Sequence, residues 1–210
     1  MNTIVYACDA NYAGLTAISA VSALAHNPGC RIVLLGYKLA EESREIVRTR
    51  VEKAKGVFAY FDVSPQIKNL VEKGYDGYTS YAAYARVFIP EILNGEGRVL
   101  YLDCDTLVAG SLNELFETDL HGKPFALAGD CIVSAYKKYI SLSADRPYFN
   151  SGVMLMDLAK WRERRCTERI LEELAHPHGP NPLGDQDVIV RCFPDETAAL
   201  SPRWNFASSA

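Results

Sequence analysis

The sequence predicts a single α/β domain with a mostly parallel central sheet flanked by helices. Short apolar runs typical of buried strands alternate with longer periodic or charged segments typical of helices. A strand–helix–strand–helix–strand order implies parallel pairing with right-handed crossovers. The 210 residues suit one large domain with a substantial core; 49% are hydrophobic and 23% charged, an ordinary globular mixture.

Charge and cysteine usage exclude several classes of protein. The formal net charge is −4, and Lys and Arg form no strong block, so no nucleic-acid partner is expected. The six cysteines are dispersed, without metal-binding spacing, and no signal peptide precedes the first strand. We therefore expect reduced thiols and a cytoplasmic location. No apolar stretch approaches the roughly 18 residues needed to span a bilayer, so no transmembrane segment is expected.

The first third of the chain predicts the strand–helix series. A strand is expected at residues 3–7, and a helix follows that carries Leu15, Ile18 and Leu24 and closes near Asn27. Further strands are expected at residues 32–36 and 57–61, with a charged surface helix at residues 41–54 between them.

Asp9 and Asn11 lie in the turn between the first strand and the first helix. Free backbone N–H groups and short polar side chains at such a turn can meet a nucleotide. Capping of the helix by Asp9 or Asn11 explains the same residues. From this segment alone, capping is the favoured interpretation.

The next segment is less regular. Residues 65–78 are poorly periodic and predict no defined element. A helix is then expected from Tyr81 to Ile89, with Thr79 or Ser80 as its cap and Pro90 near its end.

Two carboxylates, Asp103 and Asp105, follow the unbroken apolar run at residues 99–102, which suits a strand buried on both faces. Ionised carboxylates are costly to bury unless they are paired or bound to a cation, and ligands of open α/β sheets bind at the carboxyl ends of strands. Hard oxygen ligands favour Mg²⁺ or Mn²⁺, with substrate phosphates completing the shell. A bare Asp-x-Asp is more often a turn and N-cap before a helix, here around residues 112–116. The position after a core strand favours the metal interpretation.

Arg86 interrupts the apolar sequence of the helix expected at residues 81–89. An Arg on such a helix usually extends its charged end to the surface or pairs with a carboxylate. It could instead hold Asp103 or touch a ligand oxygen, and the sequence does not decide between these roles.

The second half continues the alternation of strands and helices. We expect a short helix over residues 111–117 capped by Ser111, a strand at residues 125–128 and an apolar strand at residues 153–156. Asn150 and Gly152, before the last strand, are natural turn or bulge residues, or a place where the backbone approaches a ligand closely.

Several residues near the end have specific expectations. Asp157 is expected to cap a long helix over residues 158–175, and Trp161 to pack in the core. His176 and His178, in a Pro/Gly loop, are expected to be exposed loop residues rather than ligands. One acid of the segment at residues 185–187 is expected to be an N-cap, which leaves at least one polar side chain to face a pocket.

Six motifs occur in a fixed order along almost the whole chain. They are Val5-Tyr-Ala-Cys-Asp-Ala-Asn-Tyr12, Tyr84-Ala-Arg86, Val99-Leu-Tyr-Leu-Asp-Cys-Asp-Thr-Leu-Val108, Tyr148-Phe-Asn-Ser-Gly-Val153, Asp185-Gln-Asp187 and Arg203-Trp-Asn-Phe206. Each is weak alone, but together they resemble the family 8 glycosyltransferases, retaining enzymes that include glycogenin and bacterial lipopolysaccharide galactosyltransferases. The resemblance implies a GT-A-type nucleotide-sugar-binding domain that uses a UDP-sugar donor and Mn²⁺, with Mg²⁺ as the alternative.

The resemblance also implies roles for individual residues. Asp103 and Asp105 match the Mn²⁺ ligands, and Arg86 and Asp130 match residues that line the donor-sugar pocket. The residues that match contacts to uracil and ribose are Ala7, Asp9, Asn11 and Tyr12. Those that match residues around the sugar and the acceptor are Asn150, Asp185 and Gln186. Cys104 and Ser151, inside the matching motifs, complete the expected substrate-binding set, and Gln186, Asp185, Asn150 and Asp130 form the expected catalytic set.

No residue is an obvious covalent nucleophile, and the amide of Gln186 would be a poor one. We therefore expect front-face attack through an oxocarbenium-like state, with the leaving phosphate as proton acceptor and the metal neutralising the diphosphate. The acceptor would be a carbohydrate, a lipid-linked glycan or a protein. A homo-oligomer is an expected alternative to a monomer.

The family normally continues to a His-x-x-Gly-x-Lys-Pro-Trp segment that supplies a third metal ligand and diphosphate contacts. The sequence stops at Ala210 without it, so residues 1–210 are expected to form a catalytic domain that lacks this segment and transfers sugar weakly.

Two rival functions remain open. One is a non-catalytic or impaired nucleotide-sugar-binding domain. The other is a haloacid-dehalogenase-type phosphatase, a class that also places Asp-x-Asp after a buried strand. Its pattern requires Thr or Val four residues after the first Asp, where this chain has Leu107.

Overall fold

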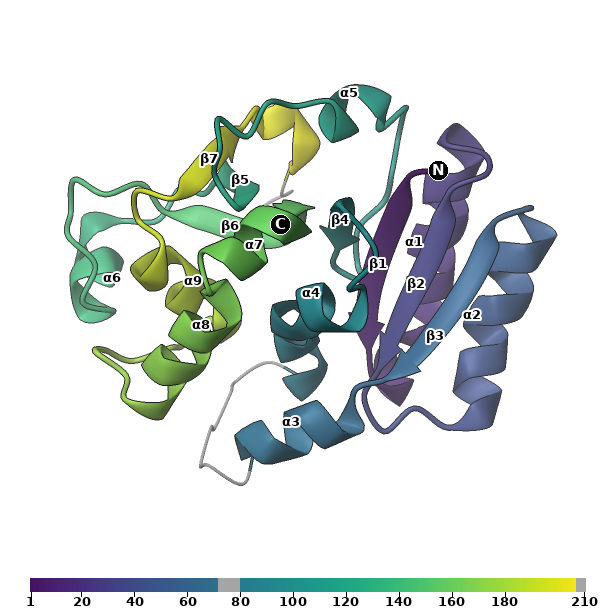
Figure 1. Ribbon diagram of the computed structural model, residues 1–210, viewed down its shortest axis with the longest axis horizontal. Coiled ribbons are helices and arrows are strands. Elements are labelled where there is room, and N and C mark those ends of the chain that lie inside the picture. Colours follow the sequence, from purple (N-terminus) through teal and green to yellow (C-terminus); the bar gives the residue numbers. More distant parts are fainter. Residues whose placement is uncertain (72–79, 207–210) are drawn as a thin grey trace.

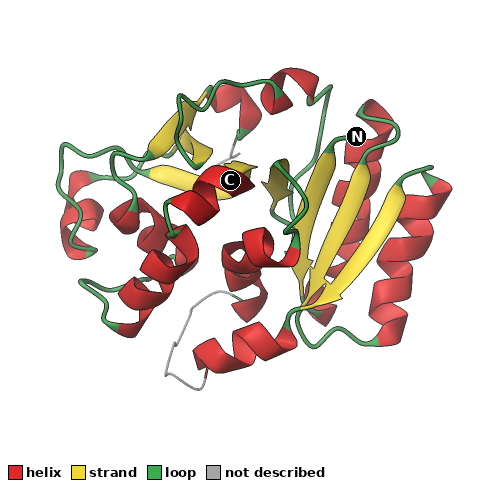
Figure 2. Cartoon of the chain, in the orientation of Figure 1, coloured by secondary structure: helices red, strands yellow, loops and turns green. Residues whose placement is uncertain are grey.

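The computed structural model describes residues 1–71 and 80–206. Within these residues the strands form one seven-stranded sheet in the order β3-β2-β1-β4-β6-β5-β7 (Figures 1 and 2). The strands are β1 (Thr3–Cys8), β2 (Arg31–Gly36), β3 (Val57–Asp62), β4 (Arg98–Leu102), β5 (Phe125–Gly129), β6 (Phe149–Asp157) and β7 (Thr197–Leu200).

Helices connect most of the strands. The α-helices are α1 (Ala13–His26), α2 (Glu41–Lys53), α3 (Ser64–Val71), α4 (Ile89–Ile92), α5 (Asn113–Phe116), α6 (Ser134–Tyr139), α7 (Leu158–Glu163), α8 (Cys166–Ala175) and α9 (Asp185–Cys192). The 3-10 helices are η1 (Ala10–Tyr12), η2 (Tyr81–Phe88) and η3 (Pro202–Trp204). Among the described residues no helix is both long enough and apolar enough to cross a bilayer.

The predicted fold class is confirmed, because most strand pairs of the sheet are parallel. β1 pairs in parallel with β2 and β4, β2 with β3, and β5 with β7. The exception is β6, which runs antiparallel to both β4 and β5. This reversal brings the amino end of β6 beside the carboxyl end of β4, where the backbone N–H of Asp103 donates to the carbonyl of Gly152 over 2.8 Å.

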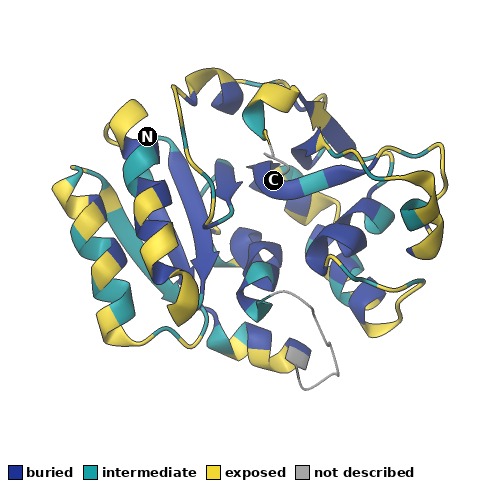
Figure 3. Ribbon diagram, turned by 180° about the vertical axis from the view of Figure 1, so that it is seen from behind, coloured by how far each residue is buried: buried dark blue, intermediate teal, exposed yellow. Residues whose placement is uncertain are grey.

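The sheet separates two hydrophobic cores. Successive residues of a strand point to opposite faces, so Ile4 and Tyr6 pack beneath α1 and α2, whereas Val5 and Ala7 face η2, α4 and α7–α9. Figure 1 shows α1 and α2 on one side of β1–β3 with α3 and α4 on the other. In Figure 3 the strands of the sheet are mostly dark blue, whereas the outer faces of α1 and α2 are largely exposed. All six residues of β1 are buried, as expected of a central parallel strand covered on both faces.

The first helix buries a different face from the one its large apolar residues would suggest. Leu15 and Ile18 are 45% and 58% exposed, whereas Ala13, Ala17 and Ala20 are buried. These small side chains allow α1 to lie close to the sheet, so large apolar side chains are left on its outer surface.

Several predicted elements need correction. The helix expected at residues 81–89 is the 3-10 helix η2, which is capped by Ser80. Pro90 follows the end of η2, as predicted, and lies in the first turn of α4. Proline is tolerated there because the first N–H groups of a helix have no intrahelical partner. The alternative cap, Thr79, and residues 72–78 lie outside the described residues, whereas α3 occupies the first half of the segment at residues 65–78.

The predicted long helix over residues 158–175 is interrupted. Asp157 caps it as predicted, accepting from the N–H of Lys160 over 2.9 Å. Arg165, at a φ of 52°, adopts a left-handed conformation that ends α7 before α8 begins. Trp161 is 1% exposed and packs against Phe125 and Phe193, which confirms its predicted role in the core.

The start of α9 also differs from the prediction. Its N-cap is Gly184 at a φ of 62°, not one of the acids that follow. Asp185 faces Arg86 instead, and Asp187 accepts from the N–H of Leu183 over 2.8 Å. Two further elements, α6 and β7, were not predicted from the sequence.

Candidate functional site

The candidate site begins at the end of β4 with Asp103, whose two carboxylate oxygens have different surroundings. Oδ1 accepts from the Tyr101 hydroxyl over 2.8 Å and from Nη2 of Arg86 over 2.9 Å. Oδ2 has no hydrogen-bond partner among the described residues, and the side chain is 36% exposed. One oxygen of Asp103 is therefore held by the protein, and the other remains able to bind a ligand.

Arg86 connects β4, β6 and α9. It is 2% exposed, donates from Nη1 to the carbonyl of Ser151 over 2.6 Å, and lies over the ring of Tyr101 at 4.3 Å. Burial by itself lowers the pKa of Arg86, but the carboxylates of Asp185 and Asp103 raise it overall, so the guanidinium remains charged. Of the roles that the sequence left open, the structure shows Arg86 pairing with carboxylates and holding Asp103.

Asp185 is buried and incompletely satisfied. Its Oδ2 lies 2.9 Å from Nε of Arg86, yet this N–H donates to the carbonyl of Ala83, so the contact is an ion pair without hydrogen-bond geometry. Among the described residues Oδ2 has no hydrogen-bond partner. Burial raises the pKa of Asp185 to about 6, and Arg86 opposes this shift. A buried oxygen of this kind fits a ligand hydroxyl that can donate to it.

A cavity of about 880 Å³ opens beside Asp103. Its lining includes Asp103, Asp105, Asn150 and Gly152, together with Arg203, Trp204, Asn205 and Phe206 from the last described segment. The exposed side chain of Asp105 makes no hydrogen bond or ion pair within residues 1–71 and 80–206.

The oxygens that line this cavity fit a hard divalent cation. A Cβ added to Gly152 would lie 2.9 Å from Oδ2 of Asp103 and 3.0 Å from Oδ1 of Asn150, so the absent side chain leaves room beside the carboxylate. Carboxylate and amide oxygens are the ligands that Mg²⁺ and Mn²⁺ prefer. The part of the chain that the structure describes contains no group of three His, Cys, Asp or Glu residues arranged to hold a metal.

The turn after β1 adjoins this site. The Cys104 thiol donates to the carbonyl of Ala7 over 3.0 Å, which joins the ends of β4 and β1. Asp9 accepts from the N–H of Asn11 over 2.9 Å, as a cap does, and its second oxygen accepts from the Ser80 hydroxyl over 2.6 Å. Asp9 therefore acts as a cap, but of the 3-10 helix η1 rather than of α1, whose N-cap Tyr12 makes no side-chain cap bond. The cap fixes the carboxylate at the carboxyl edge of the sheet.

A second set of amides surrounds Ser151. The side-chain oxygen of Gln186 accepts from the N–H of Ser151 over 3.0 Å. Oδ1 of Asn150 accepts from the N–H of Gly152 and from the side chain of Asn205, and Nδ2 of Asn150 donates to Asp130 over 3.4 Å. Asn150 lies next to a shift of the β5–β6 register, which confirms the predicted bulge.

The structure thus brings most of the predicted site residues to one edge of the sheet. Asn11 and Tyr12 are exposed at the turn after β1, whereas Cys104 and Ser151 are buried and are connected by hydrogen bonds to Ala7 and Gln186. Their contacts with substrate remain predictions.

No role in the site was predicted for Tyr101, Tyr148 or Asp187, although Asp187 was one of the two acids considered as an N-cap. Tyr101 had a usable signal, because residues i and i+2 of a strand share a face and Asp103 follows two positions later. The hydrogen bonds of Tyr148 depend on contact between β6 and α9, which no local pattern reveals.

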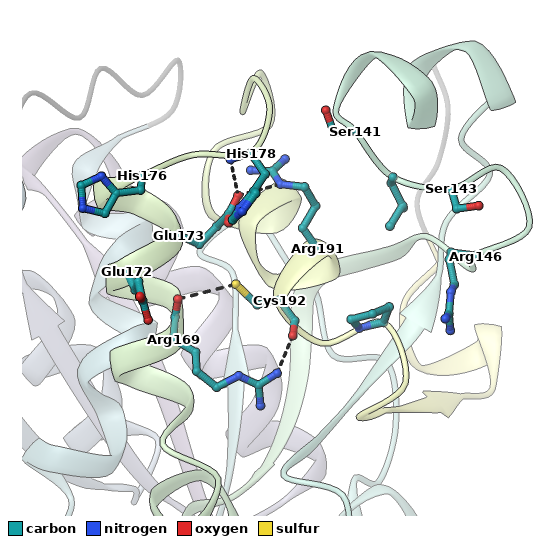
Figure 4. A pocket seen from close by; sticks show the side chains of 12 residues that line it. Ser141, Ser143, Arg146, Arg169, Glu172, Glu173, His176, His178, Arg191 and Cys192 are labelled. Atoms are coloured by element: carbon teal, nitrogen blue, oxygen red, sulfur yellow. Dashed lines mark hydrogen bonds and ion pairs between the residues drawn. The ribbon is translucent and has the colours of Figure 1, made fainter.

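A second cavity of about 750 Å³ lies between α8, α9 and the loops beside them (Figure 4). Its arginines are all paired with carboxylates: Arg191 with Glu173, Arg169 with Glu196, and Arg146 with Asp195. The predicted exposure of His176 and His178 is confirmed, although Nδ1 of His178 lies 2.5 Å from Glu173. Because its arginines are already paired, this cavity is a weaker candidate than the one at β4.

The mostly parallel sheet with paired carboxylates after a central strand agrees with the GT-A fold of the glycosyltransferase LgtC, which this chain resembles in structure. The family model described as Glycosyl transferase family 8 matches residues 3–210, and the chain belongs to this family.

Individual relatives agree with this assignment. Glycosyltransferase GlyF of Streptococcus pneumoniae serotype 4 (strain ATCC BAA-334 / TIGR4) is 30% identical over 204 residues, which are 97% of this chain and 48% of that protein. A structure of the galactosyltransferase LgtC in complex with donor and acceptor sugar analogs gives a TM-score of 0.81 at 29% identity, covering 96% of this chain and 74% of LgtC. The structure of GlyE from Streptococcus pneumoniae TIGR4 gives 0.74 at 26% identity, covering 98% and 46%. The chain spans about half the length of the curated relatives that it matches.

Proposed function

We propose that this chain binds a UDP-sugar together with a divalent cation and transfers the hexose, with retention, to an acceptor hydroxyl. The observation that carries this proposal is the hydrogen bonding of Asp103. Its Oδ1 is held by Tyr101 and Arg86, whereas its Oδ2 remains unpaired beside the cavity. Membership of family 8 supports transfer over binding alone.

Asp103 and Asp105 would hold the cation, Mn²⁺ in the first instance and Mg²⁺ as the alternative. A bound divalent cation supplies a Lewis acid that neutralises the charge building on the departing diphosphate. Arg86 and Tyr101 keep the Asp103 carboxylate in one orientation, and Gly152 leaves the space beside it open.

The nucleoside would lie against the turn after β1. Asp9 is held there by Ser80 and by the N–H of Asn11, so its carboxylate is oriented before a ligand arrives. Exposed Tyr12 and the backbone at Ala7 would complete the contacts with uracil and ribose.

The sugar would lie between β6 and α9. The unsatisfied Oδ2 of Asp185 would accept from a sugar hydroxyl, and Asn150, Asp130 and Gln186 would surround the reacting carbon. Such fixed polar groups act by holding the sugar in the geometry of attack.

Retention of the sugar's configuration without a covalent intermediate would agree with the hydrogen bonding of Gln186. Its side-chain oxygen already accepts from the N–H of Ser151, and an amide oxygen is a weak nucleophile. We therefore favour attack by the acceptor hydroxyl on the face that the diphosphate leaves, with a phosphate oxygen taking the proton. The acceptor would be a carbohydrate, a lipid-linked glycan or a protein.

A thermal-shift screen of UDP-sugars with and without Mn²⁺ tests the binding step, because a ligand that binds only the native state raises the apparent stability. Calorimetry with Asp105→Asn then tests the cation site: UDP binding that depends on Mn²⁺ should be lost while the folded structure is retained. Unchanged UDP affinity in this variant would refute the assignment of Asp105.

Product analysis separates the remaining functions. Sugar transfer or UDP-sugar hydrolysis supports the transferase, and binding without either supports a nucleotide-sugar-binding domain. Hydrolysis of p-nitrophenyl phosphate would indicate a phosphatase instead.

A further inference from the structure

A chain of hydrogen bonds connects α9 to β6 through a buried tyrosine that the proposed function does not use. The Tyr148 hydroxyl donates to Oδ1 of Asp187 over 2.7 Å, and Nε2 of Gln186 donates to the same hydroxyl over 3.1 Å. At the far end, the side-chain oxygen of Gln186 accepts from the N–H of Ser151. Tyr148 and Asp187 are 2% and 0% exposed, so little water competes for these groups.

In this series of hydrogen bonds, the donor and acceptor properties of the groups fix which atom donates in each bond. The N–H of Ser151 can only donate, so the atom of Gln186 that faces it must be the amide oxygen. The other end of the amide is then the nitrogen, which can only donate, so the Tyr148 oxygen must accept from it. The single hydroxyl proton of Tyr148 is therefore directed to Asp187.

Asp187 is well suited to be the final acceptor in this series of hydrogen bonds. Its carboxylate accepts from the Tyr148 hydroxyl, from the Tyr136 hydroxyl over 3.1 Å and from the N–H of Leu183 over 2.8 Å. Burial and the hydrogen bond to Asp187 raise the pKa of Tyr148 far above its usual range, so the hydroxyl keeps the proton that it donates.

We propose that Tyr148 and Asp187 are positioning residues that hold the amide of Gln186 in one orientation. In this orientation Nε2 retains one N–H that has no partner among the described residues and that can donate to an oxygen of the bound sugar. A reversed amide would place Nε2 against the N–H of Ser151 and would leave both donors unpaired. The inference rests on the proposed function for the identity of the ligand, but the hydrogen-bond chain itself does not.

The chain offers a matched control in Tyr136. Its hydroxyl also donates to Asp187, and its ring packs edge-on against Tyr148 at 6.1 Å, yet none of its observed contacts involves Gln186. Tyr136→Phe therefore removes one donor from the same carboxylate without interrupting the chain, whereas Tyr148→Phe interrupts it.

The first measurement compares the steady-state kinetics of UDP-sugar hydrolysis or transfer. Tyr148→Phe should lower kcat by about 100-fold with little change in KM for the donor, because the sugar is bound but imperfectly oriented. Tyr136→Phe should remain within about threefold of the unmodified chain. Asp187→Asn should lower kcat about as much as Tyr148→Phe does. The amide N–H that replaces a carboxylate oxygen cannot accept a hydrogen bond from the Tyr148 hydroxyl. Equal effects of the two Tyr→Phe changes on kcat would overturn the proposal.

The second measurement does not depend on activity. Amide hydrogen exchange of Ser151 reports its bond to Gln186, and it should accelerate by about tenfold in Tyr148→Phe but not in Tyr136→Phe. The amide of Leu155, deeper in β6, should be unaffected in both variants and serves as the check on folding.

Unaltered exchange of Ser151 in a folded Tyr148→Phe variant would refute the positioning role even if the chain transfers sugar. Accelerated exchange in a chain that handles no UDP-sugar would instead leave the positioning of Gln186 supported and refute the proposed function.

Discussion

The hydroxyl of Tyr101 donates to Oδ1 of Asp103 over 2.8 Å, so the last buried aromatic residue of β4 orients the first carboxylate beyond it. The two residues are two positions apart, and they therefore lie on the same face of the sheet. Arg86 reinforces the arrangement by packing over the Tyr101 ring while donating to the same oxygen. The result is a carboxylate whose free oxygen is oriented before any ligand binds.

Removing this hydroxyl should weaken cation-dependent binding without unfolding the chain. Residues that orient a metal-binding carboxylate typically contribute about tenfold in affinity, so Tyr101→Phe should weaken Mn²⁺-dependent UDP binding by about this factor. Isothermal titration calorimetry measures the effect, and Tyr139→Phe is the control because Tyr139 is 60% exposed. A Tyr101→Phe variant that binds UDP as tightly as the control would show that the hydroxyl is dispensable.

Adding a methyl group at Gly152 should obstruct the candidate cation site directly. The Cβ would lie 2.9 Å from Oδ2 of Asp103, closer than such atoms normally approach, so the carboxylate would have to move. We expect Gly152→Ala to abolish the additional thermal stabilisation that UDP gives in the presence of Mn²⁺. Gly95→Ala, where nothing lies within 4 Å, should retain it. Full retention in both variants would place the cation elsewhere.

Asp9 and Asp103 should contribute to the binding of different parts of the nucleotide. Asp9→Ala should weaken UDP and uridine alike, by about tenfold, because its expected contacts are to the nucleoside. Asp103→Ala should weaken UDP far more than uridine, which lacks the diphosphate that the cation would bind. Competition binding gives, for each variant, the ratio of its loss in UDP affinity to its loss in uridine affinity. The same ratio in both variants would contradict this division of roles.

Asp185 should make the stability of the ligand-free chain depend on pH. Its pKa is raised from 3.8 to about 6, so between these values the native state binds more protons at Asp185 than the unfolded state does. Stability therefore falls as the pH rises through this interval, and the full penalty remains above it. Relative to Asp185→Asn, the unmodified chain should lose on the order of 2–3 kcal/mol of unfolding free energy between about pH 4 and pH 7. Urea denaturation across this range measures the difference, and a constant difference would contradict the expectation.

The pair Glu173 and Arg191 should contribute to stability rather than to nucleotide binding. Nε of Arg191 lies 2.9 Å from Glu173, and the two side chains are 6% and 8% exposed (Figure 4). Removing one partner of a buried pair leaves the other charge uncompensated, so Glu173→Gln should cost about 3 kcal/mol in denaturant unfolding at neutral pH. Glu172→Gln, at the exposed neighbouring position, is the control and should cost less than about 0.5 kcal/mol. Equal costs would show that the buried pair adds nothing.

The sequence by itself determined the strands of the first half, the carboxylates after β4 and the family to which the chain belongs. Residues 99–102 are apolar without interruption, and a run of this kind can only be satisfied between two covered faces. The polar residues that follow such runs then lie at one edge of a parallel sheet, so Asp103 and Asp105 were recognisable as candidate site residues from their position after a core strand. Asp9, in contrast, became a candidate only through the resemblance to the family, because its own segment favoured simple capping.

Only the tertiary structure decided how these residues cooperate. The antiparallel direction of β6 places Gly152 against Asp103, and no spacing in the sequence encodes that direction. Arg86 donates to Asp103 and to the carbonyl of Ser151 and also forms an ion pair with Asp185, whereas the sequence left its role open. Contacts between residues this far apart depend on the packing of whole elements. The chain of Asp187, Tyr148 and Gln186 likewise exists only because the packed fold excludes water from those groups, and each must then find its partner within the protein.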